Sequence, residues 1–427
     1  MKNRSLKVLC SLIGGAAMSV SCLAADDIRP EVSYQPLDLQ RAFGAELVPQ
    51  KSSLDVRWQY LGKAYFGGDE QPTAGSKIES ERSDRVDAND LAKQVRPGDL
   101  RQWIAVNLDT GEEYLVELPI DTAKSLRSLA TQSGYDVGHE GSAKQPTDHF
   151  TQPEPGAAKG LSNGVDTRTR RFNNTTYPFR AMGQIGGGLD WGCSGTLVGR
   201  RHVLTAAHCL YDTGDNKWTL GGKFRAGREG SCNGASCEPY GEQSGKWYFT
   251  PAAWRTTGQY KYDYGMMVLR GTPGSQTGWM GYAARSQGSL EDYCDKVPFG
   301  PGYLGGRCYN RGYPACSFVE APLECRLNNN LQGWAYQDQE PCEIGSFYTT
   351  GADGWASRFS TNCDLSRGHS GSAIYTDAYN GSGKVVFGVV STQTCTTCSS
   401  NSTYVNGIRR ITPEVLDMIS YFKAEMP

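Results

Sequence analysis

The chain lacks any excess of charge of one sign. Its 427 residues include 43 Lys and Arg against 45 Asp and Glu, which gives a formal net charge of −2. This balance provides no electrostatic reason to expect binding to nucleic acid or to an anionic membrane. With 38% hydrophobic and 11% aromatic residues, the composition allows a packed core and excludes global disorder.

Cysteine is absent between residues 23 and 192, and histidine is scarce throughout. Two of the 14 cysteines, Cys10 and Cys22, lie near the N-terminus, so the remaining twelve all follow residue 192. An even number concentrated in one part of the chain indicates disulfides and an exported protein. Only three histidines follow residue 150, and no paired C-x-x-C spacing recurs. We therefore expect neither a metal site nor a cofactor.

Long hydrophobic runs are absent beyond the N-terminus. There, three basic residues precede an apolar stretch over 8–20 and a run of small residues over 21–25. This pattern is typical of a secretory signal peptide, and the apolar stretch is too short to favour a stable membrane span. We predict a signal peptide over residues 1–25 and a secreted protein. Periplasmic retention, or lipid anchoring at Cys22, is the weaker alternative.

Residues 26–160 contain no cysteine, but their pattern predicts some structure. Alternating apolar residues on both sides of the turn at 109–111 predict a hairpin over Trp103–Leu118. A short amphipathic helix is expected over Asp121–Gln132. Residues 145–165, rich in Pro, Gly and Ser, indicate an exposed linker. We interpret 26–160 as a small α+β propeptide that ends in this linker. A retained N-terminal module is the alternative.

Residues 161–427 are predicted to be mainly β. Short apolar runs recur between glycine-rich turns, a spacing that favours a barrel or a sandwich. A C-terminal helix is expected, with Thr412 as its cap and Pro413 in its first turn. The predicted strands are Phe179–Ile185, Gly195–Val198, His202–Ala206, Gly265–Leu269, Ala373–Tyr375 and Val385–Val390.

The first segment that carries chemistry surrounds His208. It reads Leu-Thr-Ala-Ala-His-Cys over residues 204–209, and its small residues allow close packing of the backbone beside an imidazole. Cys193 precedes Cys209 by 16 residues, a gap consistent with a bridge that holds this segment to a neighbouring strand. A lone histidine is more often structural than catalytic, so His208 needs support from other residues.

That support comes from Ser370 and Asp263. Ser370 lies in Gly-His-Ser-Gly-Ser over residues 368–372, where a tight turn can expose its hydroxyl. The N–H groups of Gly368 and Ser370 could then stabilise an oxyanion. Asp263 directly precedes an apolar strand and could orient an imidazole. Each feature alone is ordinary, but the order His, Asp, Ser, with gaps of 55 and 107 residues, indicates a serine peptidase.

The segment from Cys193 to Cys209 closely resembles the trypsin/chymotrypsin superfamily. Residues 168–183 and 368–372 look more like its bacterial glutamyl-endopeptidase-like branch. The resemblance implies a chymotrypsin-like fold of two six-stranded antiparallel β-barrels and hydrolysis of peptides through an acyl-enzyme. It implies Ser370 as the nucleophile, His208 as the general acid/base, Asp263 as the residue that holds the imidazole tautomer, and the Gly368 and Ser370 N–H groups as the oxyanion hole.

The resemblance also implies a substrate site. Ser391 lies in the strand that lines the primary specificity pocket and pairs with the substrate backbone. Asp364 stands where trypsin-like enzymes bind Arg or Lys, which favours cleavage after these residues; stabilising its own loop is the alternative role. Gln393 occupies a position that is usually glycine. Val390 replaces the histidine of Glu-preferring pockets, so a preference for Glu is not expected.

The chain departs from the superfamily pattern at His369, where pancreatic-type enzymes carry the Asp that receives the new N-terminus. Activation by that switch is therefore not expected, and the propeptide is expected to mask the site or to assist folding. Cys232 and Cys237 are expected to pair locally. Cys363 is expected to pair with Cys395 or Cys398.

The sequence leaves two alternatives each for the mature N-terminus and for the activity. The branch resemblance favours a mature N-terminus near residues 161–164, whereas Arg168, Arg170 and Arg171 offer basic cleavage points. We expect a monomer whose partners are protein or peptide substrates and its own propeptide. A catalytically silent homologue that acts as a binding or adhesion module is the alternative. An α/β-hydrolase is excluded because no histidine follows residue 369.

Overall fold

The structure is a computed structural model. It describes residues 56–66, 88–96, 101–118, 166–186, 192–219, 222–232, 234–294, 308–328, 331–339, 341–350, 355–376, 385–395 and 404–426. The predicted signal peptide, the helix predicted over 121–132 and the linker over 145–165 lie outside these residues. No helix within the described ranges is long and apolar enough to cross a membrane.

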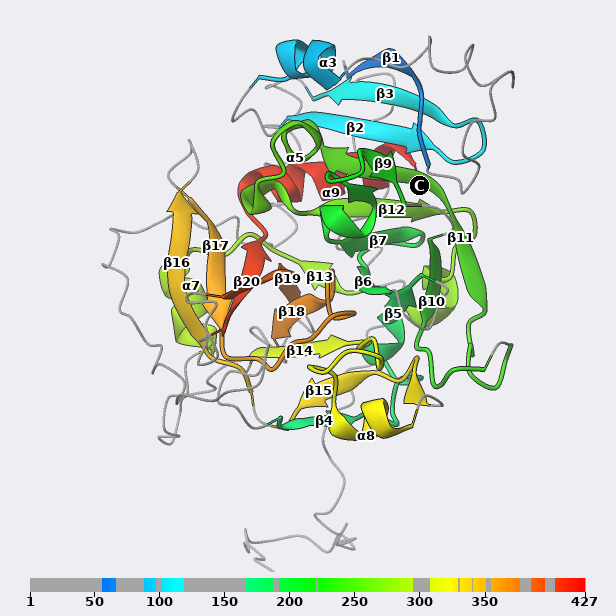
Figure 1. Cartoon of the computed structure of the whole chain (residues 1–427), viewed down its shortest axis with the longest axis vertical. Helices are drawn as coiled ribbons and strands as arrows, with labels where there is room; N and C mark the ends of the chain where they lie inside the picture. The colour runs from blue at the N-terminus through cyan, green and yellow to red at the C-terminus, as the bar shows by residue number, and fades with distance from the viewer. Residues whose placement is uncertain are drawn as a thin grey trace, which may run out of the picture. The chain divides into compact units, whose positions relative to one another are not determined.

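Six antiparallel strands form a closed barrel (Figure 1). Its closure depends on β11 (Glu242–Pro251), which pairs with β10 at one end and with β12 farther along. The other strands, in order from β10 to β12, are β10 (Lys223–Ala226), β5 (Met182–Ile185), β6 (Cys193–Leu197), β7 (His202–Thr205) and β12 (Gly265–Leu269).

Short elements connect these strands. The predicted strand over 179–185 begins only at Met182, because Phe179–Ala181 form the 3-10 helix η2. A small hairpin of β8 (Tyr211–Asp212) and β9 (Lys217–Trp218) follows the 3-10 helix η3 (Ala207–Cys209). The remaining helices here are α5 (Ala252–Thr257), η4 (Tyr260–Tyr262) and α6 (Gly274–Thr277).

Three N-terminal strands extend the sheet of this barrel. β2 (Gln102–Asn107) pairs with β11, and β3 (Glu112–Glu117) and β1 (Arg57–Lys63) follow in the order β11-β2-β3-β1. The β2–β3 hairpin confirms the hairpin predicted over 103–118. Figure 1 shows these strands, in blue and cyan, continuing from β11. The short helix α3 (Ala88–Gln94) lies between β1 and β2 in the sequence.

The second sheet forms a partly closed barrel. Its six main strands run in the order β16 (Ile344–Thr350), β17 (Ala356–Thr361), β20 (Tyr404–Arg410), β19 (Val385–Cys395), β18 (Ala373–Thr376) and β14 (Cys308–Gly312). A single bridge between Cys308 and Cys342 brings the two ends together. β15 (Tyr336–Asp338) and β4 (Arg168–Arg170) continue from β14, and β13 (Gly281–Tyr282) pairs with β19. Helices α7 (Gln287–Cys294) and α8 (Leu323–Leu327) occupy its connections.

The C-terminal helix α9 (Pro413–Glu425) confirms the predicted helix and packs against the first barrel. Its buried Phe422 lies against the rings of Phe249 and Trp103, at centroid distances of 3.7 and 6.0 Å. Thr412 occupies the N-cap position, but its side chain makes no capping hydrogen bond. The mainly β fold with two barrels and a C-terminal helix is thereby confirmed, with the second barrel closed only in part.

Five disulfides link cysteines of the described chain: Cys193–Cys209, Cys232–Cys237, Cys294–Cys308, Cys316–Cys325 and Cys342–Cys363. The pairing predicted for Cys363 was wrong, because its partner is Cys342 and not Cys395 or Cys398. The strand register explains this pairing. Ile344 lies opposite Thr361 in the antiparallel pair β16–β17, so Cys342 comes to lie opposite Cys363.

Candidate active site

His208 and Asp263 form a hydrogen-bonded pair. Asp263 ends η4 just before β12, and its side chain is fully buried. One carboxylate oxygen accepts from the His208 backbone N–H at 2.9 Å, and the other lies 2.8 Å from His208 Nδ1. Both the backbone and the ring of the histidine are therefore held by one carboxylate.

This carboxylate determines the protonation behaviour of His208. Desolvation lowers the pKa of the imidazole, but the charge of Asp263 and its hydrogen bond more than offset that effect. The pKa of His208 therefore lies above its usual value. Ser391 supports the pair, because its hydroxyl donates to Asp263 Oδ2 at 2.6 Å. The Cys193–Cys209 disulfide links β6 to the turn that carries His208.

A cleft of about 830 Å³ brings His208 and Ser370 together. This volume is within the range typical of ligand sites. One side of the cleft comes from the residues that follow His208, including Tyr211 and Trp218. The other side comes from residues 365–367, Ser370 and residues 390–392. The three residues of the predicted triad thus converge in space, from η3, from the start of β12 and from the loop before β18.

The loop over residues 366–372, called the nucleophile loop after the role expected of Ser370, is tied to the first barrel by Ser194 of β6. The Ser194 hydroxyl donates to the carbonyl oxygen of Gly368 at 2.7 Å, and its backbone N–H donates to the carbonyl oxygen of Ser370 at 2.7 Å. The same hydroxyl accepts from the Tyr313 N–H at 2.8 Å. A single serine therefore connects the nucleophile loop to both sheets.

The backbone orientation of this loop follows from its other hydrogen bonds. The carbonyl of Arg367 accepts from the Ala315 N–H at 2.8 Å, and the carbonyl of His369 accepts from the N–H of Ser372 at 2.8 Å. In a trans peptide the C=O and N–H groups point in opposite directions. The N–H groups of Gly368 and Ser370 therefore point away from Ala315 and Ser372, respectively.

Two glycines are required by this geometry. Gly368 has φ +94°, and a Cβ atom there would overlap with the backbone of residues 313–315. Gly371 has φ +82°, and a Cβ atom there would overlap with Thr205 Oγ1 and the carbonyl oxygen of Ser194. Both conformations favour glycine. The absence of a side chain at Gly371 lets the nucleophile loop approach the strand that leads to His208.

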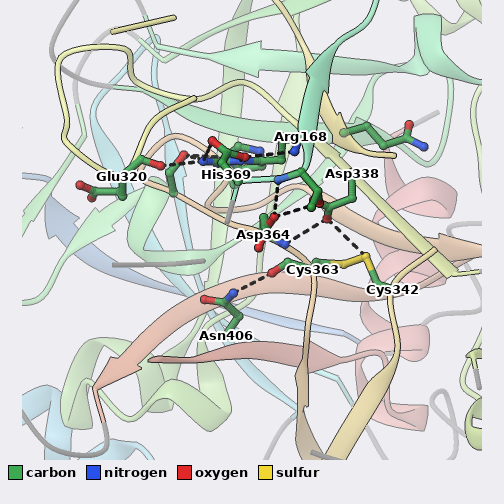
Figure 2. A network of polar contacts seen from close by, with 12 residues as sticks. Arg168, Glu320, Asp338, Cys342, Cys363, Asp364, His369 and Asn406 are labelled. Atoms are coloured by element: carbon green, nitrogen blue, oxygen red, sulfur yellow. Dashed lines mark hydrogen bonds and ion pairs between the residues drawn. A yellow bond between two sulfur atoms is a disulfide. The ribbon is translucent and has the colours of Figure 1, made fainter. Parts of the chain in front are cut away.

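Asp364 is buried beneath the nucleophile loop, in the network drawn in Figure 2. Its Oδ2 accepts from the backbone N–H and the hydroxyl of Thr167, at 2.9 and 3.0 Å. Its own N–H donates to Asp338, whose pKa is raised well above the usual value by burial and by the charge of Asp364. Asp364 does not belong to the lining of the cleft. Its contacts are those of a residue that holds β4 in place.

Arg168 is the central cation of the same network. Its side chain donates two hydrogen bonds to Asp166, one to Ser366 Oγ at 2.7 Å and one to the carbonyl oxygen of Glu320 at 2.6 Å. Ser366 in turn lies 3.2 Å from His369 Nδ1. Burial and the nearby Arg168 charge lower the pKa of His369 well below its usual value. His369 is thus a neutral buried side chain beside the nucleophile.

The remaining predicted site residues are placed as follows. Ser391 donates its hydroxyl to Asp263 and is one of the residues that line the cleft. The backbone of Gln393 pairs with Asn406 in the β19–β20 ladder, while its side chain lies outside the described part. In the described ranges, the only groups with metal-ligand spacing include Cys193 and Cys209 or Cys342 and Cys363, whose sulfur atoms are already joined in disulfides.

The sequence did not predict that Ser194 and Arg168 hold the nucleophile loop. Ser194 lies 174 positions from Gly368, and Arg168 lies 198 positions from Ser366. Ser194 lies within a strand and Arg168 lies near a candidate processing point. In neither case does the neighbouring sequence indicate which distant residue the side chain contacts. Only the flanking glycines of the nucleophile loop indicated that its backbone would be packed closely.

Comparison with known proteins agrees with this geometry. Residues 166–309 match the family model described as Trypsin. The chain is 37% identical over 120 residues to a protein named glutamyl endopeptidase from Bacillus licheniformis, covering 28% of this chain and 36% of that protein. It is 35% identical over 131 residues to a protein named extracellular metalloprotease from Bacillus subtilis, covering 30% and 40%. The matched part thus spans well under half of either relative.

Two other comparisons are relevant. A protein named inactive serine protease 35 from Bos taurus is 30% identical over 122 residues, covering 26% of this chain and 29% of that protein. A solved structure of a Glu endopeptidase in complex with MPD superimposes with a TM-score of 0.42 at 21% identity, covering 61% of this chain and 98% of that structure. The match over residues 166–309 and the similarity to the Bacillus licheniformis protein support the predicted resemblance of this region to trypsin/chymotrypsin-like serine peptidases of the glutamyl-endopeptidase-like branch.

Proposed function

We propose that the protein is an active serine endopeptidase that hydrolyses peptide bonds through an acyl-enzyme. One observation carries the proposal: His208, which is hydrogen-bonded to the buried Asp263, lines the same cleft as Ser370. In the proposed reaction His208 takes the proton of Ser370 as the hydroxyl attacks the scissile carbonyl. His208 then gives this proton to the leaving amine, and the acyl-enzyme is hydrolysed by water.

The proposed oxyanion hole consists of the N–H groups of Gly368 and Ser370. Support comes from the hydrogen bonds that turn the neighbouring carbonyls toward Ala315 and Ser372. Donors that are already oriented stabilise the developing charge without reorganisation during the reaction. Asp263 is proposed to hold the imidazole tautomer and to stabilise the imidazolium that forms.

For the biology of the chain we propose export, removal of residues 1–25, and processing before Asp166. The last point is supported by the side chain of Arg168, which binds both Asp166 and the nucleophile loop. Cleavage after Arg168, Arg170 or Arg171 would cut the chain between Arg168 and the rest of the peptidase region, so that these contacts would no longer be covalently part of it. A mature N-terminus in the 161–164 region would preserve them. N-terminal sequencing of the secreted protein tests this, and a start after Arg171 in active enzyme would contradict it.

Two substrate preferences are proposed as alternatives: cleavage after Arg or Lys, and cleavage after an acidic residue. Cleavage after Arg or Lys requires that Asp364 receive the substrate cation, although Thr167 already binds one of its oxygens. Cleavage after an acidic residue is favoured by Arg358, a buried cation that donates to Thr392 Oγ1 at 2.6 Å on the wall of the cleft. A digest of a peptide library by the purified enzyme distinguishes the two.

The alternative function is a silent homologue that acts as a binding or adhesion module. This alternative is considered because the chain is also similar to proteins named inactive serine protease 35. The test is labelling of purified secreted protein with a fluorophosphonate, in parallel with a Ser370→Ala variant. Labelling of the wild type alone supports the peptidase. Absence of labelling in folded wild-type protein, with no cleavage of the peptide library, would leave the binding module as the better explanation.

A further inference from the structure

The N-terminal strands continue the barrel sheet through backbone hydrogen bonds. Five residue pairs, from Trp103 opposite Pro251 to Asn107 opposite Trp247, connect β2 to β11. Without β2 this edge of β11 would present unpaired N–H and C=O groups, which is costly for a buried strand. β2 therefore serves as an integral strand of the sheet.

Buried side chains join the same segment to the barrel. Glu113 of β3 forms an ion pair with Arg255 of α5 at 2.7 Å, and the indole N–H of Trp218 in β9 donates to it. The side chains of Glu113 and Arg255 are only 5% and 10% exposed. Trp103 is 2% exposed and packs against Tyr264, with a ring distance of 5.5 Å. Separation of the segment would break this buried ion pair and expose the apolar surface of Trp103 to water, which disfavours it.

The chain that directly follows β1 reaches the cleft. The carbonyl of Tyr65 accepts from the Trp218 N–H at 2.8 Å, which fixes the chain beside the β8–β9 hairpin. The next residue, Phe66, is half-buried and lines the same cleft as His208 and Ser370. A residue 100 positions before the matched peptidase region thus contributes an apolar side chain to the cleft wall.

The position of Phe66 relative to His208 indicates which half of a substrate it would meet. His208 must deliver a proton to the leaving amine, so the leaving half of the peptide passes beside the imidazole. Tyr211 and Trp218, which follow His208 in the chain, line the cleft together with Phe66. Because the Trp218 N–H binds the carbonyl of Tyr65, Phe66 lies beside the segment that follows His208.

We propose that residues 56–118 remain bound to the first barrel in the working enzyme, and that Phe66 forms part of the subsite for the residue after the scissile bond, where it favours an apolar side chain. This inference rests on the proposed peptidase function. It assigns to the N-terminal segment a role in substrate selection that continues after any cleavage in the linker.

The first experiment compares Phe66→Ala with the wild type on three substrates. Two peptides share one acyl half and carry Leu or Ser directly after the scissile bond, and the third substrate is an ester of the same acyl half with a small alcohol. We expect Phe66→Ala to lower kcat/KM about tenfold for the Leu peptide, in line with the loss of apolar contact in a pocket. The Ser peptide and the ester should change little.

A matched control is Tyr60→Ala, which removes an exposed aromatic side chain of β1, in the same N-terminal segment but outside the cleft lining. It should leave all three rates unchanged. Equal turnover of the Leu peptide by Phe66→Ala and wild type overturns the inference, and so does an equal loss on all three substrates. A wild type that turns over none of them overturns the peptidase function as well.

The second experiment tests retention. Secreted enzyme produced from the full chain is passed through size exclusion under native conditions, and its peptides are identified by mass spectrometry. We expect residues 56–118 in the active fraction, within an intact chain or as a co-eluting fragment. A fully active fraction that contains only residues after 160 overturns the inference while leaving the peptidase function intact.

Discussion

Replacing Arg168 by Met tests how far β4 supports the nucleophile loop. The Arg168 side chain is fully buried and holds Asp166, Ser366 and the Glu320 carbonyl at once. Met retains much of the apolar stem but none of the donors. We expect the variant to be less stable and its remaining folded fraction to be poorly active, because Ser366 connects Arg168 to His369 beside the nucleophile.

The magnitude follows from the lost contacts. Hydrogen bonds from a charged group contribute about 1.5–3 kcal/mol each, and Arg168 makes two of these to the neutral partners Ser366 and Glu320. Asp166 is partly exposed and regains water, so its loss adds less. The expected fall in the free energy of unfolding is about 3–6 kcal/mol. If the Gly368 N–H is displaced as well, kcat should fall by about 10²–10³.

The assay combines urea unfolding with the rate of fluorophosphonate labelling in the absence of denaturant. Arg170→Met is the matched control, because Arg170 lies on the same strand and its ion pair with Glu324 is long, at 3.9 Å, and half exposed. The control should lose less than about 1 kcal/mol. Wild-type stability and labelling in Arg168→Met would refute the proposed support of the loop by β4.

Three further predictions concern the catalytic pair, a disulfide and a glycine. Activity needs neutral His208, so it should be lost as the pH falls through a pKa raised above 6.5; in Asp263→Asn this limb of the pH–rate profile should move to lower pH while kcat falls about 10⁴-fold. A profile with an unmoved limb would contradict the assigned pairing. Replacing Cys193 and Cys209 by Ser opens a loop of 16 residues and should lower the free energy of unfolding by about 3 kcal/mol; thermal and urea unfolding measure this. Gly368→Ala should lower kcat by at least about 10² with the fold kept, as judged by circular dichroism, since its Cβ has no space; wild-type kinetics would show that this backbone is not needed.

Much of the fold could be predicted because its signals are local. The hairpin of β2 and β3 is encoded by alternation around one turn, and α9 by an apolar face that begins at Pro413. Other features depend on distant contacts that no local pattern records. The partner of Cys363 follows from the β16–β17 register, and the attachment of β2 to β11 follows from an edge that only the assembled barrel presents.

In the candidate site too, some residues could be predicted from local sequence, whereas the environment of others depends on distant contacts. The three residues of the predicted triad lie in short segments with distinctive neighbours, and the structure brings those segments to one cleft. Asp364 was harder to interpret, because its position in the sequence fits both a pocket carboxylate and a loop anchor. Only the hydrogen bonds from Thr167, 197 positions away, distinguish the two environments. The contribution of Phe66 had no signal in the sequence at all.

The position of Ser194 has a consequence for self-digestion, if the protein is the peptidase proposed above. Its hydrogen bonds to Gly368 and Ser370 make the reactive loop depend on contact between the first barrel and the second. Under the proposed peptidase function, a copy in which the barrels come apart therefore loses its activity just as its chain becomes accessible to cleavage. Partly unfolded molecules would then be cleaved without cleaving others, which would limit the spread of self-digestion in a concentrated population.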